Sequence, residues 1–428
     1  MPRPSEAPGP APPPRPTVGV HYGWVVVGAA FSVLFVAYGV QYSFGLFFTA
    51  LAAEFGWSRA SLSGVFSLYG GAYAFLGLFA GRLTDRWGPR AVVATGALLY
   101  GLGLALSGRI SWLGQLYLTY LLAAAGMSTA YVPCSATVVK WFTAKRGLAI
   151  GITIAGASLG TFACPPLIAL LLANVGWRAA YGILGGVLFG LIAGLAPLLV
   201  REPSARGLDP YGGVPDSARR SEATATSWRP GEVLRHPSFW GLLAVYTATW
   251  IPVFLPLVHL VPLAQDLGLG PAVGAATLSA LGIGAVAGRL AMGALSDRIG
   301  RRPTLAIALG LQALSFLSLA LAGSAPALLA SAALFGYCYG AISSLMPAIV
   351  GDYYGPAHAG SLVGIIFGVA GPASALGPFL AGWVFDTAGA YTWAFLLSAL
   401  TNLLALGLLI ITRPPLRAAG PALSGACT

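Results

Sequence analysis

The sequence predicts an all-α membrane protein in which twelve transmembrane helices form two pseudo-symmetric bundles of six. Three observations support this prediction. Of the 428 residues, 57% are hydrophobic and 8% are charged, whereas a soluble globular protein carries about 25% charged residues. Apolar runs long enough to cross a hydrocarbon core of roughly 30 Å recur along almost the whole chain. The two halves of the chain also repeat one motif at a fixed offset.

The apolar runs define the order of the predicted helices. They cover residues 22–50, 61–81, 91–107, 113–139, 146–171 and 177–200, then 237–264, 272–296, 303–322, 326–351, 359–383 and 390–412. Residues 201–236 form the long polar stretch between the two sets, so the expected bundles are 21–200 and 237–412 with a central loop between them. The proline-rich segment 1–20 is expected to be a disordered tail, and 413–428 a second tail.

The positions of Lys and Arg predict the orientation in a lipid bilayer. Nineteen of the 23 basic residues lie on the side of the tails and the central loop, three lie on the other side, and Arg289 lies within a span. Because basic residues concentrate in cytoplasmic loops, both termini are expected in the cytoplasm and the protein in the cell (inner) membrane. The net charge of +11 therefore reflects topology, and no nucleic-acid partner is expected.

A repeated loop motif relates the two halves. GRLTDRWGPR at 81–90 returns as GALSDRIGRR at 293–302, an offset of 212 residues, and further glycines and prolines match at nearly the same offset. Parallel repeats of this kind are typical of secondary transporters, which hold substrate near the midplane between the halves. No enzyme is expected, because the chain carries no metal-ligand spacing, phosphate-binding loop or nucleophile motif. Neither a cofactor nor a metal is expected.

The charged residues of the motif are expected to form a conformational latch on the cytoplasmic side. The carboxylates accept from arginines and lie near a helix N-terminus of the other half, while Gly81 and Gly293 allow close helix approach. The alternative is a solvated charged turn. The candidate latch residues are Asp85, Arg86, Arg90, Asp297, Arg298 and Arg302.

Arg289 is the one charge in the thirty residues from Leu267 to Ser296. A lone arginine in the middle of a transmembrane helix costs at least about 2.5 to 3.5 kcal/mol, so it normally faces a cavity or a partner. No Asp or Glu lies inside a predicted span. The counter-ion is therefore expected from outside, and a carboxylate fits a guanidinium through two parallel hydrogen bonds. The alternative is an arginine that only bonds backbone carbonyls and holds helices together.

His259 is the second candidate, because it is the one histidine in the apolar interior of a span. Prolines 252, 256 and 262 are expected to bend its helix. A histidine titrates near neutral pH, so His259 is suited to donate to a bound carboxylate or to carry a proton; a structural histidine is the alternative. Four tyrosines lie at similar depth and are weaker candidates for substrate contact, with packed aromatics as their alternative: Tyr42, Tyr131, Tyr337 and Tyr339.

Several stretches resemble the monocarboxylate transporter family of the major facilitator superfamily and its bacterial relatives, including oxalate/formate exchangers. They are HYGWVVVGAAF, YSFGLFFTALAAEFGWSRA, KWFTAKRGLAIGI, PLVHLVPLAQDLG and AGRLAMGALSDRIG. The resemblance covers residues 20–412 and implies the major facilitator fold, with Arg289 as the substrate-anion site. It also implies, for many members, that a proton moves with the anion.

The chain departs from this family at three places. Ala285 stands where animal members have an aspartate, and Gln41 or Tyr42 stands where they have a lysine. The stretch GIIFGVAGPAS at 364–374 lacks the lysine of the oxalate exchangers. One buried cation suits one carboxylate, because a second carboxylate would lose its hydration without a partner. A monocarboxylate such as lactate, pyruvate or a short-chain acid is therefore preferred over oxalate.

The sequence thus predicts a monomeric carrier that moves a small monocarboxylate by alternating access, with Arg289 holding the anion and His259 assisting. A proton moving with each anion would make the cycle electroneutral. Three alternatives stay open at this point: an organic-anion exchanger of the oxalate/formate type, an exporter of hydrophobic compounds, and a sensor built on a transporter scaffold. An exporter would need no arginine at this depth, and a sensor usually adds a soluble domain.

Overall fold

The computed structural model describes residues 21–213, 228, 230–355 and 359–415, and its regular secondary structure in these ranges is helical apart from one isolated bridge between Phe142 and Tyr211. The predicted all-α fold is confirmed. The predicted disordered tail 1–20, part of the central loop and most of the tail 413–428 lie outside the described residues.

The first bundle consists of six helical elements. They are α1 (Tyr22–Gln41), α2 (Phe44–Phe55), α3 (Arg59–Trp87), α4 (Pro89–Ser107), α5 (Leu113–Trp141) and α6 (Arg146–Leu195). The connection to the second bundle holds η1 (Ala196–Leu198), η2 (Pro203–Arg206) and α8 (Pro230–Val233). The second bundle consists of α9 (Pro237–Trp250), α10 (Leu255–Asp266), α11 (Gly270–Ile299), α12 (Arg301–Leu321), α13 (Ala325–Tyr354), α14 (Ala359–Ser374), α15 (Leu376–Ala388) and α16 (Thr392–Ile411).

These helices make twelve membrane crossings. Eleven segments of the described chain are long and apolar enough to span a membrane, and one of them, Gly147–Leu198, has 52 residues. A straight helix of that length would measure about 78 Å at 1.5 Å per residue, far beyond one crossing. The chain turns back at Gly176, whose φ of +73° belongs to the region that favours glycine. The predicted spans 146–171 and 177–200 therefore correspond to the two legs of α6.

Three crossings are interrupted near the middle of the bundle. The first breaks between α1 and α2 at Tyr42 and Ser43, and the seventh breaks between α9 and α10, where Pro252 lies. The eleventh breaks between α14 and α15 at Ala375. Pro252 therefore interrupts its helix as predicted. Pro256 and Pro262 both lie within α10, which has no break. Pro256 occupies its first turn, where a missing N–H costs little, and a bend at these two prolines stays a prediction.

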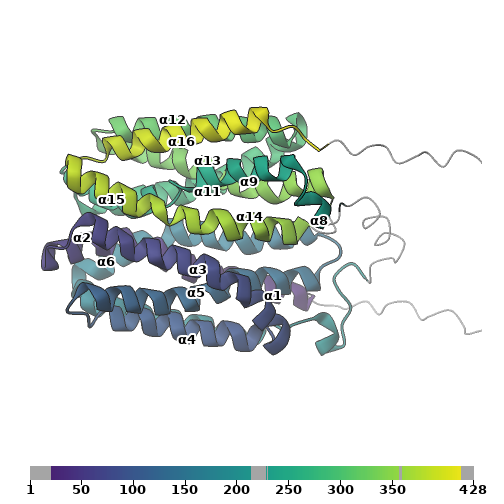
Figure 1. Ribbon diagram of the computed structural model, residues 1–428. Helices are drawn as coiled ribbons and strands as arrows, with labels where there is room; N and C mark the ends of the chain where they lie inside the picture. Colours follow the sequence, from purple (N-terminus) through teal and green to yellow (C-terminus); the bar gives the residue numbers. More distant parts are fainter. Residues whose placement is uncertain (1–20, 214–227, 229, 356–358, 416–428) are drawn as a thin grey trace, which may run out of the picture.

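The helix bounds follow the sequence repeat. Helices α2 and α10 both contain 12 residues, and α4 begins at Pro89 while α12 begins 212 residues later at Arg301. Figure 1 shows the two bundles as two layers, with α1–α6 below and α9–α16 above. Where the bundles meet, α3 packs against α14 and α15, α6 against α11, and α2 against α10.

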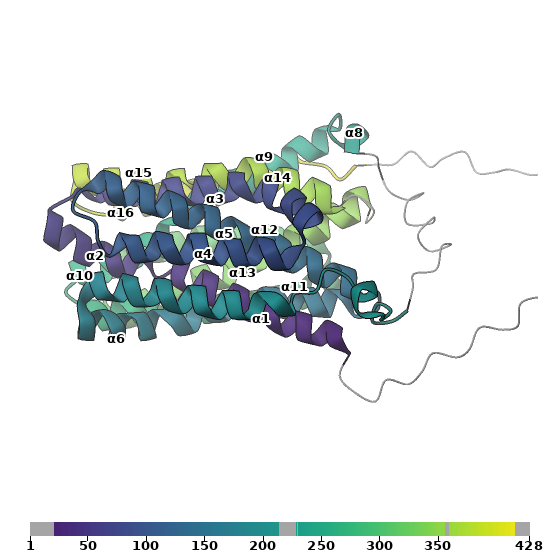
Figure 2. The ribbon, with the colours of Figure 1, turned by 90° about the horizontal axis from the view of Figure 1, so that it is seen from below.

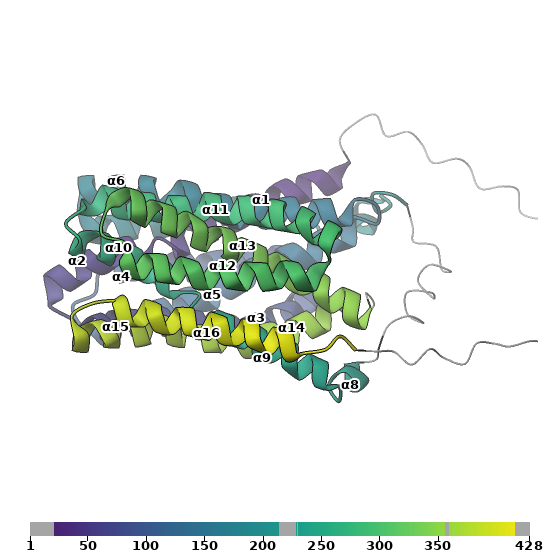
Figure 3. The same cartoon turned by 90° about the horizontal axis from the view of Figure 1, so that it is seen from above.

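The bundle has two distinct ends. Helix α1 begins and α16 ends at the same end as α8, which we call the connector end (Figure 1). The other end, called the opposite end, carries α2, α10 and α15 (Figures 2 and 3). This distinction matters for the site, because polar contacts between the bundles are not distributed evenly along the bundle axis.

The first part of the predicted central loop is folded onto the first bundle. Tyr211 donates its backbone N–H to Trp141 and accepts from the backbone N–H of Thr143. The guanidinium of Arg206 lies 3.7 Å from the ring centroid of Tyr22. The polar composition of 201–236 did not reveal this docking, because its contacts are mainly backbone hydrogen bonds and ring packing.

Candidate functional site

Arg289 lies on α11 at mid-depth, where the two bundles meet. Its side chain is half-buried, and its Nη1 donates a hydrogen bond to Ser158 Oγ on α6 of the first bundle. Among the described residues, no carboxylate forms an ion pair with Arg289. Within the described ranges, its one hydrogen-bond partner is therefore a serine hydroxyl. The positive charge of Arg289 has no acidic partner among these residues.

Tyrosines from both bundles lie in the region of this arginine. Tyr42 lies at the break between α1 and α2, and its hydroxyl is 3.3 Å from that of Tyr339 on α13. Electrostatic interactions link Arg289 to Tyr42 and to Tyr131 on α5, and Tyr131 in turn to Tyr339. The structure thus brings together three of the four predicted tyrosines with Arg289. The fourth, Tyr337, instead presents its backbone to Gly288, where an added Cβ would lie 1.9 Å from its carbonyl oxygen.

Two further tyrosines belong to this group and were missed in the sequence. Tyr38 on α1 and Tyr73 on α3 place their hydroxyls 2.9 Å apart, and both interact electrostatically with Tyr131. A spacing of four residues between Tyr38 and Tyr42 puts them on one face of a helix, and this signal was present in the sequence. We call Tyr38, Tyr42, Tyr73, Tyr131 and Tyr339 the tyrosine group.

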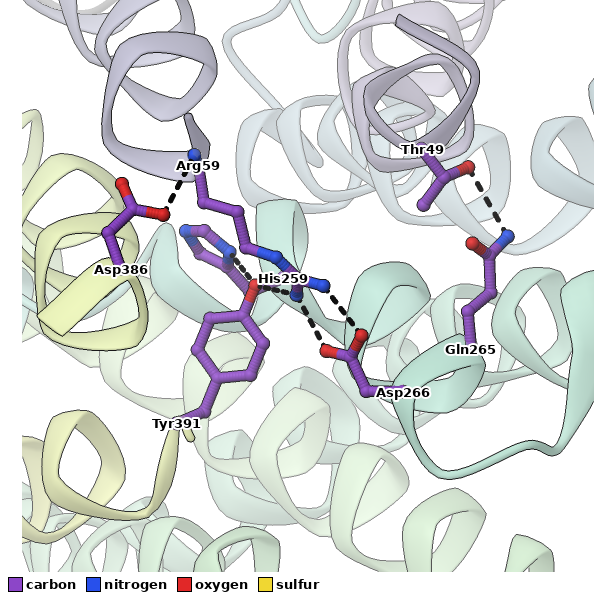
Figure 4. A network of polar contacts seen from close by, with 7 residues as sticks. All are labelled: Thr49, Arg59, His259, Gln265, Asp266, Asp386 and Tyr391. Carbon is purple, nitrogen blue, oxygen red and sulfur yellow. Dashed lines mark hydrogen bonds and ion pairs between the residues drawn. The ribbon is translucent and has the colours of Figure 1, made fainter. Parts of the chain in front are cut away.

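His259 belongs to a different cluster, near the opposite end. Its ring is fully buried, with Nδ1 2.9 Å from Tyr391 Oη (Figure 4). Its Nε2 lies 3.0 Å from the carbonyl oxygen of Pro378 and 3.1 Å from Ser63 Oγ. Because a carbonyl oxygen only accepts, Nε2 carries a proton and donates to Pro378. Burial raises the pKa of the Tyr391 phenol well above its usual range. The Tyr391 hydroxyl therefore keeps its proton: it donates to Nδ1 when the ring is neutral, and it accepts from Nδ1 when both ring nitrogens carry protons.

Arg59 connects this cluster to two acidic residues of the second bundle. Its guanidinium forms two hydrogen bonds to Asp266, of 2.5 and 2.6 Å, and donates to Tyr391 Oη at 2.6 Å. Asp386 accepts the backbone N–H groups of Arg59 and Ala60 at 3.0 and 2.8 Å, which caps the first turn of α3. We call the set of residues in these contacts the clasp: Arg59, Ser63, His259, Asp266, Asp386 and Tyr391.

The clasp joins the bundles at the opposite end. Among the described residues, the other side-chain hydrogen bonds between the bundles also lie at that end or at mid-depth: Gln265 to Thr49, Ser279 to the Phe162 carbonyl, Tyr42 with Tyr339, and Arg289 to Ser158. Within the described ranges, no such bond joins the bundles at the connector end. In this conformation the bundles are therefore held together from mid-depth to the opposite end.

Three of the six predicted latch residues make contacts inside their own bundle in this conformation. Asp85 pairs with Lys140 at 3.3 Å, and Asp297 pairs with Arg301 at 2.6 Å. Arg302 donates to the carbonyl oxygens of Leu409 and Ile410 on α16. For Arg86, Arg90 and Arg298, no ion pair occurs among the described residues.

A latch across the bundles is thus absent among the described residues here, because the bundles are joined at the other end. A Cβ added at Gly293 would also meet no atom within 4 Å, so the expected close helix approach there is not made in this conformation. The latch stays a prediction for a conformation in which the connector end closes.

Comparisons with known proteins identify the family. The chain matches the family model of the Major Facilitator Superfamily over residues 30–291 and 253–426. It is 32% identical over 397 residues to monocarboxylate transporter 13 of Bos taurus, covering 91% of this chain and 89% of the relative. The chain belongs to the monocarboxylate transporter family. It is also 28% identical over 394 residues to the oxalate:formate antiporter of Oxalobacter formigenes, covering 91% of each.

Solved structures support the fold of this transporter. The nucleoside transporter NupG superposes with a TM-score of 0.72 at 13% identity, over 92% of this chain and 100% of that one. An inward-facing, occupied structure of a bacterial homolog of the human lysosomal transporter Spinster gives 0.69 at 16% identity, over 92% and 97%. At such identities the likeness concerns the fold alone. Together with the family match, this fold makes the chain a multi-pass membrane transporter of the major facilitator superfamily and not an enzyme.

Proposed function

We propose that this transporter moves a small monocarboxylate of the lactate or pyruvate kind by alternating access, with Arg289 as the anion site. The observation that carries the proposal is a guanidinium at mid-depth with no acidic partner among the described residues. An unpaired charge in an apolar surround is costly. A carboxylate offsets that cost through charge-assisted, bidentate hydrogen bonds. The tyrosine group supplies hydroxyls for the rest of the anion.

One cation at this depth favours one carboxylate. The other basic residues of the described spans lie near span ends, as Arg59, Arg82 and Arg178 do. A dicarboxylate such as oxalate would bring a second charge with no cationic partner beside the tyrosine group. Anion exchange is the second candidate, because the oxalate:formate antiporter is among the relatives.

In an alternating-access cycle, the clasp closes the opposite end in one conformation, and the latch closes the connector end in the other. We infer that the connector end faces the cytoplasm, as the distribution of basic residues predicts, and that this conformation admits the anion from that side. When the clasp opens, Arg59 separates from Asp266 and Asp386, and the connector end closes. In that second conformation, Asp85 and Asp297 and the neighbouring arginines of the repeated motif are the residues proposed to hold the bundles together.

His259 couples this cycle to a proton in our proposal. In this proposed cycle the clasp holds the neutral ring, whose Nδ1 accepts from Tyr391, whereas in a protonated ring both nitrogens donate. A second positive charge would also lie beside Arg59, with Asp266 and Asp386 as the acidic groups nearby. Protonation from outside therefore favours the open clasp, and the clasp closes after the proton has left His259. One proton per monocarboxylate makes the cycle electroneutral.

Uptake by purified protein in liposomes tests this function. Labelled lactate, pyruvate and oxalate are supplied outside, with and without an inward proton gradient and with and without internal anion. Uptake of the monocarboxylates that is stimulated by the gradient supports the proposal. A strict requirement for internal anion would establish exchange instead, and absence of uptake for every carboxylate would refute a carboxylate carrier.

A further inference from the structure

Ser158 faces the anion site from the bundle that does not carry Arg289. It lies on α6 with 3% of its surface exposed, and its Oγ accepts a hydrogen bond from Arg289 Nη1 on α11. A guanidinium has five N–H donors. One bond to Ser158 therefore leaves the other donors of the fork for a carboxylate.

The hydroxyl proton of Ser158 is not used by its own helix. On α6, Thr153 donates to the carbonyl oxygen of Ala149 and Thr161 to that of Ala157, both at 2.9 Å, as hydroxyls in transmembrane helices commonly do. Among the described residues, Ser158 makes no such bond, and its contact with Arg289 uses only the oxygen lone pair. Its O–H therefore has no acceptor within the described ranges and can donate to a ligand.

Ser158 also lies where α6 and α11 begin to separate. Toward the opposite end the two helices are in close contact, because a Cβ on Gly282 would lie 2.5 Å from the backbone nitrogen of Phe162. Toward the connector end, Gly151 on α6 and Gly293 on α11 have no atom within 4 Å of such a position. An anion that enters from the connector end therefore meets Ser158 and Arg289 together, at the inner limit of the contact between the helices.

We propose that Ser158 is a second anion-binding residue, whose O–H donates to the carboxylate that Arg289 holds. This inference rests on the proposed monocarboxylate transport. The carboxylate group of the anion is then held from both bundles, by Arg289 of the second and Ser158 of the first. Binding of the carboxylate thereby adds a contact between the bundles at the depth where they separate, which favours closure of the connector end over the loaded site.

Kinetics of labelled pyruvate uptake in liposomes test the proposal. Ser158→Ala is expected to raise KM about tenfold, the lower end of what a hydrogen bond to a charged group contributes, with the maximal rate changed less than twofold. Ser158→Thr keeps the hydroxyl and is expected to restore most of the affinity. Thr153→Val is the matched control on the same helix and is expected to keep the wild-type KM. Thermal unfolding of each purified variant checks that the fold is kept.

The outcomes separate this inference from the proposed function. If wild type takes up pyruvate, Arg289→Ala abolishes uptake and Ser158→Ala keeps the wild-type KM, then the role of Ser158 is overturned while monocarboxylate transport stands. Equal losses in Ser158→Ala and Ser158→Thr would indicate packing alone and would also overturn it. If wild type takes up no monocarboxylate, both the proposed function and the role of Ser158 are refuted.

Discussion

Arg59 and Asp266 form a bidentate ion pair between the two bundles, with Nη2 2.5 Å from Oδ1 and Nη1 2.6 Å from Oδ2. The same arginine places its guanidinium 3.7 Å from the ring centroid of Phe385 and offers its backbone N–H to Asp386 (Figure 4). One residue at the start of α3 thus binds both α10 and α15. The opposite end opens only if these contacts break together, which makes the clasp a cooperative closure.

Removing one charge of this pair is expected to favour opening of the opposite end. Asp266→Asn keeps the shape and loses the charge. The side chains of Arg59 and Asp266 are 21% and 31% exposed, so the solvent-screened loss is about 1 kcal/mol, a shift of about fivefold in the population ratio. The measurement is the distance between spin labels attached at the exposed positions Ala53 and Thr387, one in each bundle. In Asp266→Asn, a larger fraction of the distance distribution is expected at the longer distance of the open state.

A matched control lies at the same end. Glu54 pairs with Arg178 inside the first bundle, so Glu54→Gln is expected to leave the label distances unchanged. The double variant Arg59→Asp with Asp266→Arg is expected to recover part of the short distance. Identical distance distributions in wild type and Asp266→Asn would show that the ion pair does not hold this end closed.

Proton dependence is expected to require His259. Protonation outside removes the lone pair of Nδ1 that accepts from Tyr391, so lower external pH favours the open clasp and faster monocarboxylate uptake. His259→Gln keeps an amide that donates and accepts but does not titrate. Its uptake is expected to lose most of the stimulation by an inward proton gradient. His236→Gln, which changes the residue that caps α9 at the connector end, is expected to keep it.

The close contact of α6 and α11 is expected to be sensitive to one added methyl group. A Cβ at Gly282 would lie 2.5 Å from the backbone nitrogen of Phe162, and overpacking of this kind typically costs about 1 to 3 kcal/mol. Gly282→Ala is therefore expected to slow transport about tenfold and to lengthen the distance between the labels at the opposite end. Gly310→Ala on α12, where no atom lies within 4 Å, is expected to do neither. Equal transport by both variants would argue against close packing there.

Hydropathy predicted the crossings well because each span is a local property of its own sequence. The break at Pro252 followed from a missing backbone donor, whereas the break at Tyr42 and Ser43 contains no proline and was not predicted. The repeat offset nevertheless relates the two, since residue 42 plus 212 falls on Phe254, within the break between α9 and α10.

The clasp could not be predicted from the sequence, for a physical reason. Arg59 lies 207 residues from Asp266 and 327 from Asp386, and charges at span ends are usually solvated. Only the folded arrangement shows that these ends meet. His259 was singled out as an isolated polar residue, but its partners Ser63, Tyr391 and the Pro378 carbonyl come from three distant segments. In contrast, Arg289 needed no partner to be found, because its isolation in an apolar span was itself the signal.

Transport by Arg289 variants decides whether this arginine is the anion site. Uptake of labelled pyruvate into liposomes is measured for wild type, Arg289→Ala, Arg289→Lys and the control Arg178→Ala at the opposite end. Arg289→Ala is expected to lose at least about 100-fold in uptake, since a charge-assisted bidentate contact disappears. Arg289→Lys keeps the charge without the planar fork and is expected to retain a small fraction. Uptake by Arg289→Ala at the wild-type rate and KM would contradict a carboxylate site at this residue.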